Sequence, residues 1–75
     1  MIKLKIDILQ ELKKAGYNTT RIRKEHLFSE NVITDFRKGI IIKLSTLNKL
    51  CIMLRCQPSD IIEVIPSDEE KIRFF

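Results

Sequence analysis

The sequence predicts a small all-α domain of five short helices. Three observations lead to this fold class. Apolar residues recur at helical spacing in several separate stretches, most cleanly at Leu47, Leu50, Cys51 and Leu54. Most of these stretches follow a side chain that can cap a helix, and several precede a Gly or Pro that can end one. The 75 residues allow one such domain and no second.

The composition is that of a globular domain with an uneven charge. Apolar residues make up 44% of the chain, which argues against disorder. The net charge is +4, but residues 1–57 hold 12 Lys/Arg and 5 Asp/Glu, whereas residues 58–75 hold 2 and 5. The first region would be attracted to a polyanion and the second repelled. A solvated, mildly basic surface is the simpler interpretation.

The N-terminal segment is expected to form a strand and then a helix. Residues 2–6 alternate between apolar and basic side chains, which is the period of a half-buried strand. A strand this short needs a partner. Asp7 can cap a helix that runs to Lys14, where two lysines suit the negative end of the helix dipole. Ala15-Gly16 can end that helix.

Residues 19–39 predict two short helices joined by a tight turn. Asn18 or Thr19 can cap the first of these helices, which is expected over residues 20–27 with Ile22 facing inward. Phe28 then leads directly into the second helix. About three residues therefore join the two helices.

The second of these helices has strong signals at both ends. Ser29 can cap it, and Gly39 can end it because glycine enters the left-handed conformation without steric cost. Val32, Ile33 and Phe36 share its inner face. The outer face carries hydrogen-bonding side chains of short to medium length: Glu30, Asn31, Thr34, Asp35 and Lys38.

The rest of the chain predicts two further helices and a tail. Ser45 is expected to cap the fourth helix. Pro58 fits the first position of the fifth, because its missing N–H would be unpaired there anyway, and Pro66 ends that helix. Residues 1–66 are therefore expected to form the domain, and residues 67–75 an acidic and apolar tail.

The order and spacing of these elements resemble the Cro/C1-type (xenobiotic-response-element-like) helix-turn-helix family over about residues 7–65. The apolar positions of that motif match Ile22, Phe28, Ile33 and Phe36. Ser29 matches the residue that opens the recognition helix of the family, and Gly39 the one that ends it. Residues 47–63 are similar to the small stand-alone members from bacterial operons and mobile elements.

The resemblance implies a five-helix, lambda-repressor-like DNA-binding domain. It also implies that the N-terminal strand pairs with a short C-terminal strand at residues 63–65, with residues 71–75 as the other candidate. Two positions depart from the family pattern. Arg23 stands where members usually have a small residue, so its side chain must extend to the surface. Leu27 stands where members usually have Gly, so Leu27 must adopt an unusual turn conformation or the turn must shift.

The resemblance further implies a sequence-specific, double-stranded-DNA-binding transcriptional regulator, most simply a repressor, that places helix 30–38 in the major groove. Base contacts are then expected from Glu30, Asn31, Thr34, Asp35 and Lys38. Phosphate contacts are expected from Thr19, Thr20, Arg21, Arg37 and Lys43. A single unit reads only a few base pairs, so a homodimer is expected, with half-sites about 34 Å apart.

An alternative hypothesis assumes the same fold but a protein partner in place of DNA. Carboxylates are repelled by phosphates unless they meet a specific donor, so Glu30 and Asp35 favour an interaction module with weak or no DNA binding. Such a module would be antitoxin-like or an accessory regulator that binds a protein through its apolar C-terminal region. If the resemblance to the motif is set aside, Asn31 and Thr34 are simply expected to be exposed, solvated side chains.

The sequence does not predict an enzyme, a cofactor, a metal site or a small-molecule ligand. There is one histidine, and the two glycines form no phosphate-binding loop. Cys51 and Cys56 are five residues apart, which favours neither a disulfide nor a metal pair. No apolar run is long enough to span a membrane. Together with reduced cysteines, this predicts a cytoplasmic protein.

Overall fold

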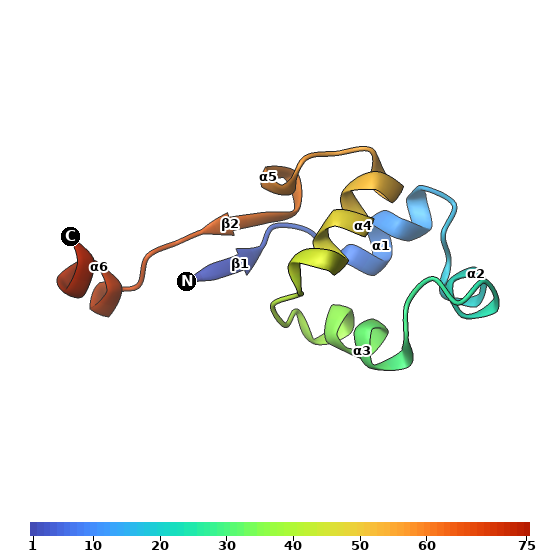
Figure 1. The fold of residues 1–75 in the computed structure, drawn as a ribbon, viewed down its shortest axis with the longest axis horizontal. Coiled ribbons are helices and arrows are strands. Elements are labelled where there is room, and N and C mark those ends of the chain that lie inside the picture. Colours follow the sequence, from blue (N-terminus) through green and yellow to red (C-terminus); the bar gives the residue numbers. More distant parts are fainter.

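The computed structural model describes residues 1–75 and contains six helices and one two-stranded sheet. In chain order the elements are β1 (Ile2–Leu4), α1 (Ile8–Lys14), α2 (Thr19–Lys24), α3 (Glu30–Lys38), α4 (Leu44–Leu54), α5 (Pro58–Ile61), β2 (Ile62–Val64) and α6 (Asp68–Phe74). Helices α1 to α5 form the body of the molecule, and α6 lies apart from it (Figure 1). The predicted mostly helical fold with a short terminal sheet is confirmed.

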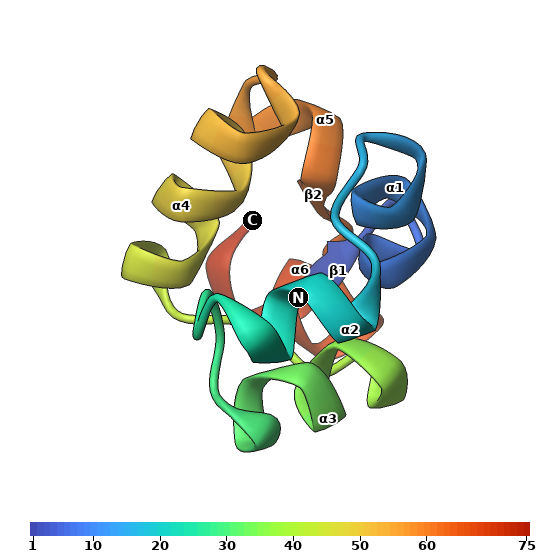
Figure 2. The same cartoon turned by 90° about the vertical axis from the view of Figure 1, so that its right-hand side faces the viewer.

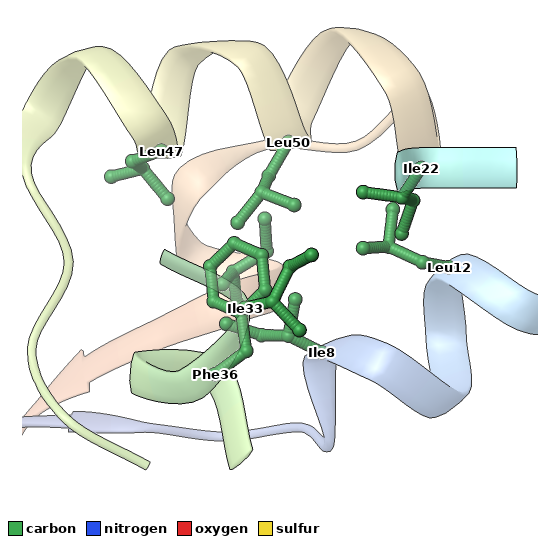
Figure 3. Close-up of a cluster of buried hydrophobic side chains, with 8 residues drawn as sticks. Ile8, Leu12, Ile22, Ile33, Phe36, Leu47 and Leu50 are labelled. Carbon is green, nitrogen blue, oxygen red and sulfur yellow. The ribbon is translucent and has the colours of Figure 1, made fainter. Parts of the chain in front are cut away.

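One apolar core holds the body together. All eight buried residues are apolar, and every helix from α1 to α5 supplies at least one: Ile8, Leu12, Ile22, Ile33, Phe36, Leu47, Leu50 and Ile61. Their side chains meet between α1, α3 and α4 (Figure 3). Burial of each such side chain contributes about 1.5–3 kcal/mol relative to exposure. The predicted inward faces of these helices are therefore correct.

The two terminal segments pair as a short antiparallel sheet. Ile2 lies opposite Val64, and Leu4 lies opposite Ile62. The ladder continues beyond the strands, because the Lys5 N–H donates to the Ile61 carbonyl at 2.8 Å. Of the two predicted partners of the N-terminal strand, the segment near residues 63–65 is confirmed.

The turn between α2 and α3 resolves the unusual position of Leu27. The residue with a left-handed backbone is His26, with φ 53°, one position earlier than expected. The Leu27 N–H donates to the Ile22 carbonyl at 3.0 Å, and the His26 N–H to the Arg23 carbonyl at 3.3 Å. These two bonds are those of a Schellman ending. The turn therefore shifts by one residue, and Leu27 stays unstrained.

Two predicted helix ends were wrong. The helix expected over residues 20–27 ends at Lys24, because the Schellman bonds close it there. The fifth helix ends at Ile61 instead of before Pro66, because residues 62–64 leave the helix to pair with β1. Pairing with a distant strand has outweighed local helical spacing at this point.

The start of the fourth helix was also placed two residues too late. Lys43 is the N-cap of α4 and makes no side-chain capping bond, so Ser45 lies within the first turn. The other predicted caps are confirmed. Asp7 accepts the Gln10 N–H at 3.3 Å, and Asn18 accepts the Arg21 N–H at 2.8 Å.

Residues 67–75, which were expected to be a tail, contain a sixth helix. We call these residues the C-terminal arm. Ser67 and Glu70 form a capping box, and the amino group of Met1 donates to the Glu70 carboxylate at 2.7 Å. This contact, with the hydrogen bonds from Ser67, lowers the pKa of Glu70 from 4.5 to about 2. No residue of α6 is buried.

Candidate nucleic-acid interface

α2 and α3 form a two-helix unit on one side of the body (Figure 2). Residues 25–29 connect them. Ser29 caps α3 by accepting the Val32 N–H at 3.3 Å, and Gly39 ends it with φ 68°. Ile33 and Phe36 bury the inner face of α3 in the core. The predicted capped helix is therefore present, with the predicted side facing inward.

The outer face of α3 is open to solvent over most of its length. Glu30, Asn31, Thr34 and Lys38 are exposed, and Asp35 is half-buried. The Thr34 hydroxyl donates to the Glu30 carbonyl at 2.9 Å. Its hydroxyl proton is thus used within the helix, which leaves the methyl group for apolar contacts.

The turn between the two helices is tied to α4. The Lys49 ammonium donates to the Leu27 carbonyl and lies 4.9 Å from the centroid of the Phe28 ring. Phe28 in turn packs edge-on against Phe36, with centroids 5.1 Å apart. These contacts hold the entry into α3 in one position. The sequence does not predict the role of Lys49, because 22 residues separate it from Leu27.

An ion pair joins α2 to the first residue of α3. Arg23 Nε donates to Glu30 Oε1 at 2.6 Å, and Arg23 Nη2 to Oε2 at 3.3 Å. Both side chains stay largely in solvent, with exposed fractions of 46% and 66%. Arg23 does extend to the surface as expected. Its pairing with Glu30 was not predicted, because the two residues are on different helices.

A depression runs between the start of α2 and the end of α3. Its lining includes Thr19 and Thr20 from α2 and Arg37 and Lys38 from α3. Two further cations line it from β1 and α1, namely Lys3 and Lys13, which sequence reasoning did not include in the site. The one carboxylate in the lining is that of Asp7. The depression therefore has a cationic, hydroxyl-bearing wall that suits an anionic backbone.

Arg21 faces a different set of partners. Its Nε donates to Glu25 at 2.5 Å, its Nη1 donates to the Gly16 carbonyl at 3.1 Å, and its guanidinium lies 4.6 Å from the Tyr17 ring centroid. The hydrogen bond and charge of Glu25 raise the pKa of the Arg21 guanidinium. Arg21 is thus held over the α1–α2 turn. Lys43, by contrast, is exposed and forms no ion pair.

Neither a metal-binding cluster nor a membrane-spanning element is found. No group of three or more His, Cys, Asp or Glu side chains is placed to hold a metal ion. None of the helices combines the length and apolar character that a bilayer crossing requires.

Comparison with known proteins identifies the family. The model of the Cro/C1-type HTH DNA-binding domain matches residues 7–67, from the cap of α1 to the cap of α6. Searches of curated proteins and of solved structures found no significant match. The matched region contains the whole body of five helices, including the α2–α3 unit. The chain therefore belongs to the Cro/C1-type helix-turn-helix family of DNA-binding regulators.

Proposed function

We propose that this protein is a sequence-specific transcriptional repressor that reads the major groove with α3. One observation carries the proposal. Within a Cro/C1-type DNA-binding domain, α3 buries Ile33 and Phe36 and turns a continuous polar face to solvent. An exposed helix of this kind fits the major groove, whose base edges carry the sequence information. We assign this role to residues 1–66 and place the protein in the cytoplasm.

The proposed base contacts lie on the exposed side of α3. Asn31 can pair with adenine through both N6 and N7, and the Thr34 methyl can contact the methyl of thymine. Glu30 can accept from cytosine N4. Asp35 and Lys38 complete the set, with Asp35 the least accessible because it is half-buried.

The proposed phosphate contacts flank this face. The hydroxyls of Thr19 and Thr20 and the cations Arg37 and Lys38 line one depression, so a single sugar-phosphate backbone can meet all four. Lys43 extends the cationic edge towards α4. Arg21 is the weakest member of the proposed set, because a phosphate must compete with Glu25 for its guanidinium.

We also propose that the protein acts as a homodimer on two half-sites about 34 Å apart. The apolar side chains available for such an interface lie at the opposite end of the molecule from α2 (Figure 1). Those with the largest exposure in that region are Val64, Ile72, Phe74 and Phe75. Sedimentation of the protein with and without Phe74→Ser tests this step, because the substitution should shift the population to monomer.

Selection from a random duplex library, followed by fluorescence polarisation, tests the main proposal. The affinity for the selected duplex should fall steeply with salt, by about 0.9 log unit per phosphate contact for each log unit of salt. Lys43→Ala should weaken binding to all duplexes alike and reduce that slope by about one unit. A protein that enriches no sequence and binds no duplex at low salt would contradict the proposal.

A second candidate is an accessory regulator that binds a protein partner through the C-terminal arm. The exposure of Ile72, Phe74 and Phe75, at 85%, 74% and 85%, favours it. Failure of the full-length protein to bind any duplex at low salt would support this candidate over the first. Specific duplex binding that is unchanged by Phe74→Ser would leave the arm free for such a partner.

A further inference from the structure

We propose that Arg23 and Glu30 act together as the reader of one G·C base pair, with Arg23 contacting the guanine. Arg23 lies on α2, outside the face of α3 to which the base contacts were assigned. The proposal rests on the proposed function, because it adds a specificity-determining residue to the same interface.

The stereochemistry of the ion pair carries the argument. Arg23 uses its side edge, Nε and Nη2, to hold both oxygens of Glu30, at 2.6 and 3.3 Å. A guanidinium has five N–H donors in a fixed plane, so this arrangement occupies two of them. The end edge, formed by Nη1 and the second N–H of Nη2, remains for another partner.

That remaining edge matches guanine. Guanine presents O6 and N7 as two adjacent acceptors in the major groove, and a bidentate arginine is the most common specific contact to them. Cytosine presents its N4 donor on the same edge of the pair. The Glu30 carboxylate retains lone pairs that can accept from N4 while it holds Arg23. The two side chains together thus complement the three groups of a G·C pair.

The position of the pair in the fold is also appropriate. In helix-turn-helix proteins the N-terminal residues of the recognition helix meet the base edges. Glu30 is the first residue of α3, and the ion pair brings the Arg23 guanidinium to that same end. Arg23 also offsets the charge of Glu30, which would otherwise be repelled by the phosphates.

The pairing pre-orients the arginine. A free arginine side chain loses rotamer freedom when it binds, whereas one held by a bidentate carboxylate has already lost much of it. Both side chains are in contact with solvent, with exposed fractions of 46% and 66%, so the ion pair itself adds little to the stability of the fold. Substitutions at either position should therefore change recognition while leaving the fold intact, which makes the proposal testable.

The experiment compares variants on the duplex selected by the parent protein and on versions with each base pair replaced. Arg23→Ala should abolish the preference for G·C at one position, with a loss of about ten- to hundredfold on the selected duplex. Arg23→Lys keeps the charge but presents a compact ammonium on a flexible stem in place of the planar fork, so it should weaken the same preference with an unchanged salt slope. Glu30→Ala should weaken the preference and strengthen non-specific binding. Lys24→Ala, which removes the neighbouring exposed cation, should leave the G·C preference intact.

Three outcomes would contradict the proposed guanine contact, each for a different reason. An equal loss by Arg23→Ala on every duplex would show a phosphate contact and overturn this inference alone. Parent-like binding by Arg23→Ala would show a purely structural ion pair and also overturn it. A parent protein that binds no duplex would overturn both this inference and the proposed function. Circular dichroism of each variant checks that the fold is retained.

Discussion

The body and the C-terminal arm of this protein are stabilised by different forces. All eight buried residues lie between Ile8 and Ile61, within the body. The arm buries none, and its helix α6 is held by a capping box and by the contact between the Met1 amino group and Glu70. The two regions lie at opposite ends of a molecule 46 Å long (Figure 1).

The two regions therefore differ in how their exposed side chains are held in place. In the body, apolar burial fixes α3 against α1, so the polar side chains of α3 are held in a rigid arrangement. In the arm, the apolar side chains Ile72, Phe74 and Phe75 are largely exposed, and Phe74 contacts only the guanidinium of its neighbour Arg73, 5.6 Å from its ring centroid, among the aromatic contacts. The molecule thus has a structured end, which carries the proposed recognition face, and an end with exposed apolar side chains, where we propose that a second copy or a partner binds.

The largest difference between the regions should appear in the response to apolar deletion. Leu50→Ala removes a fully buried side chain from α4 and should lower the free energy of unfolding by about 2–5 kcal/mol. Ile52→Ala, on the same helix, removes a side chain that is 70% exposed and should change it by less than about 0.5 kcal/mol. Chemical unfolding measures both variants. Equal effects would mean that the core is misplaced.

The next largest difference between the body and the arm should appear in how substitutions affect the affinity for DNA. Asn31→Ala should weaken binding to the selected duplex by about 1–3 kcal/mol and relax the preference at one position, because a bidentate contact to adenine is lost. Lys71→Ala removes an exposed cation from the arm and serves as the control, with no change expected beyond experimental error. Polarisation titrations compare the two. A larger effect at Lys71 would move the interface to the arm.

Substitutions at two helix endings within the body should change the free energy of unfolding by smaller amounts. His26→Gly should raise the free energy of unfolding by about 0.5–1 kcal/mol, because His26 holds a left-handed backbone at φ 53°. Gly39→Ala should lower it by about 1 kcal/mol, although no atom lies within 4 Å of the added carbon, because φ is 68° there. Thermal and urea unfolding give both values. The same sign for both substitutions would refute the assigned turn geometries.

The arm should respond to acid through Glu70. The pKa of Glu70 is lowered from 4.5 to about 2, so its charged form stabilises the arm fully above pH 4.5. That contribution is lost as the pH falls from 4.5 to about 2. The amide signal of Ser67, which donates to Glu70 at 3.0 Å, should report the change by NMR.

Two substitutions sharpen this test. Glu70→Gln should remove the acid response of the Ser67 amide, because the titrating group is gone. Glu69→Gln, at an exposed neighbouring carboxylate, should preserve it. If the Ser67 amide still responded to acid in Glu70→Gln, the titrating group would have to be another residue.

Much of the fold follows from local signals in the sequence. The caps Asp7, Asn18 and Ser29 and the ending at Gly39 are each formed by residues within a few positions of one another. The inner stripes of α1, α3 and α4 follow from helical spacing alone. These features are confirmed because local chemistry and tertiary packing favour the same structure.

The end of α2 and the start of α4 were misplaced by two to three residues for local reasons, whereas the larger error and the missed contacts arose where distant residues decide the outcome. Residues 62–64 leave the fifth helix because β1, some 60 residues earlier, supplies a strand partner. Arg23 meets Glu30, and Lys49 meets Leu27, only because the helices are folded together. Helical spacing could thus predict which side of α3 each side chain lies on. The contacts between helices that fix the start of α3 and pair Glu30 with Arg23 could not be predicted.

The most direct test of the central claim is an NMR titration of the full-length protein with its selected duplex. We expect amide shifts in α3, at the start of α2 and near Lys43, with the signals of α6 unaffected by the addition of DNA to a preformed dimer. Shifts confined to α6, or none in α3 at low salt, would contradict the claim that the polar face of α3 reads DNA.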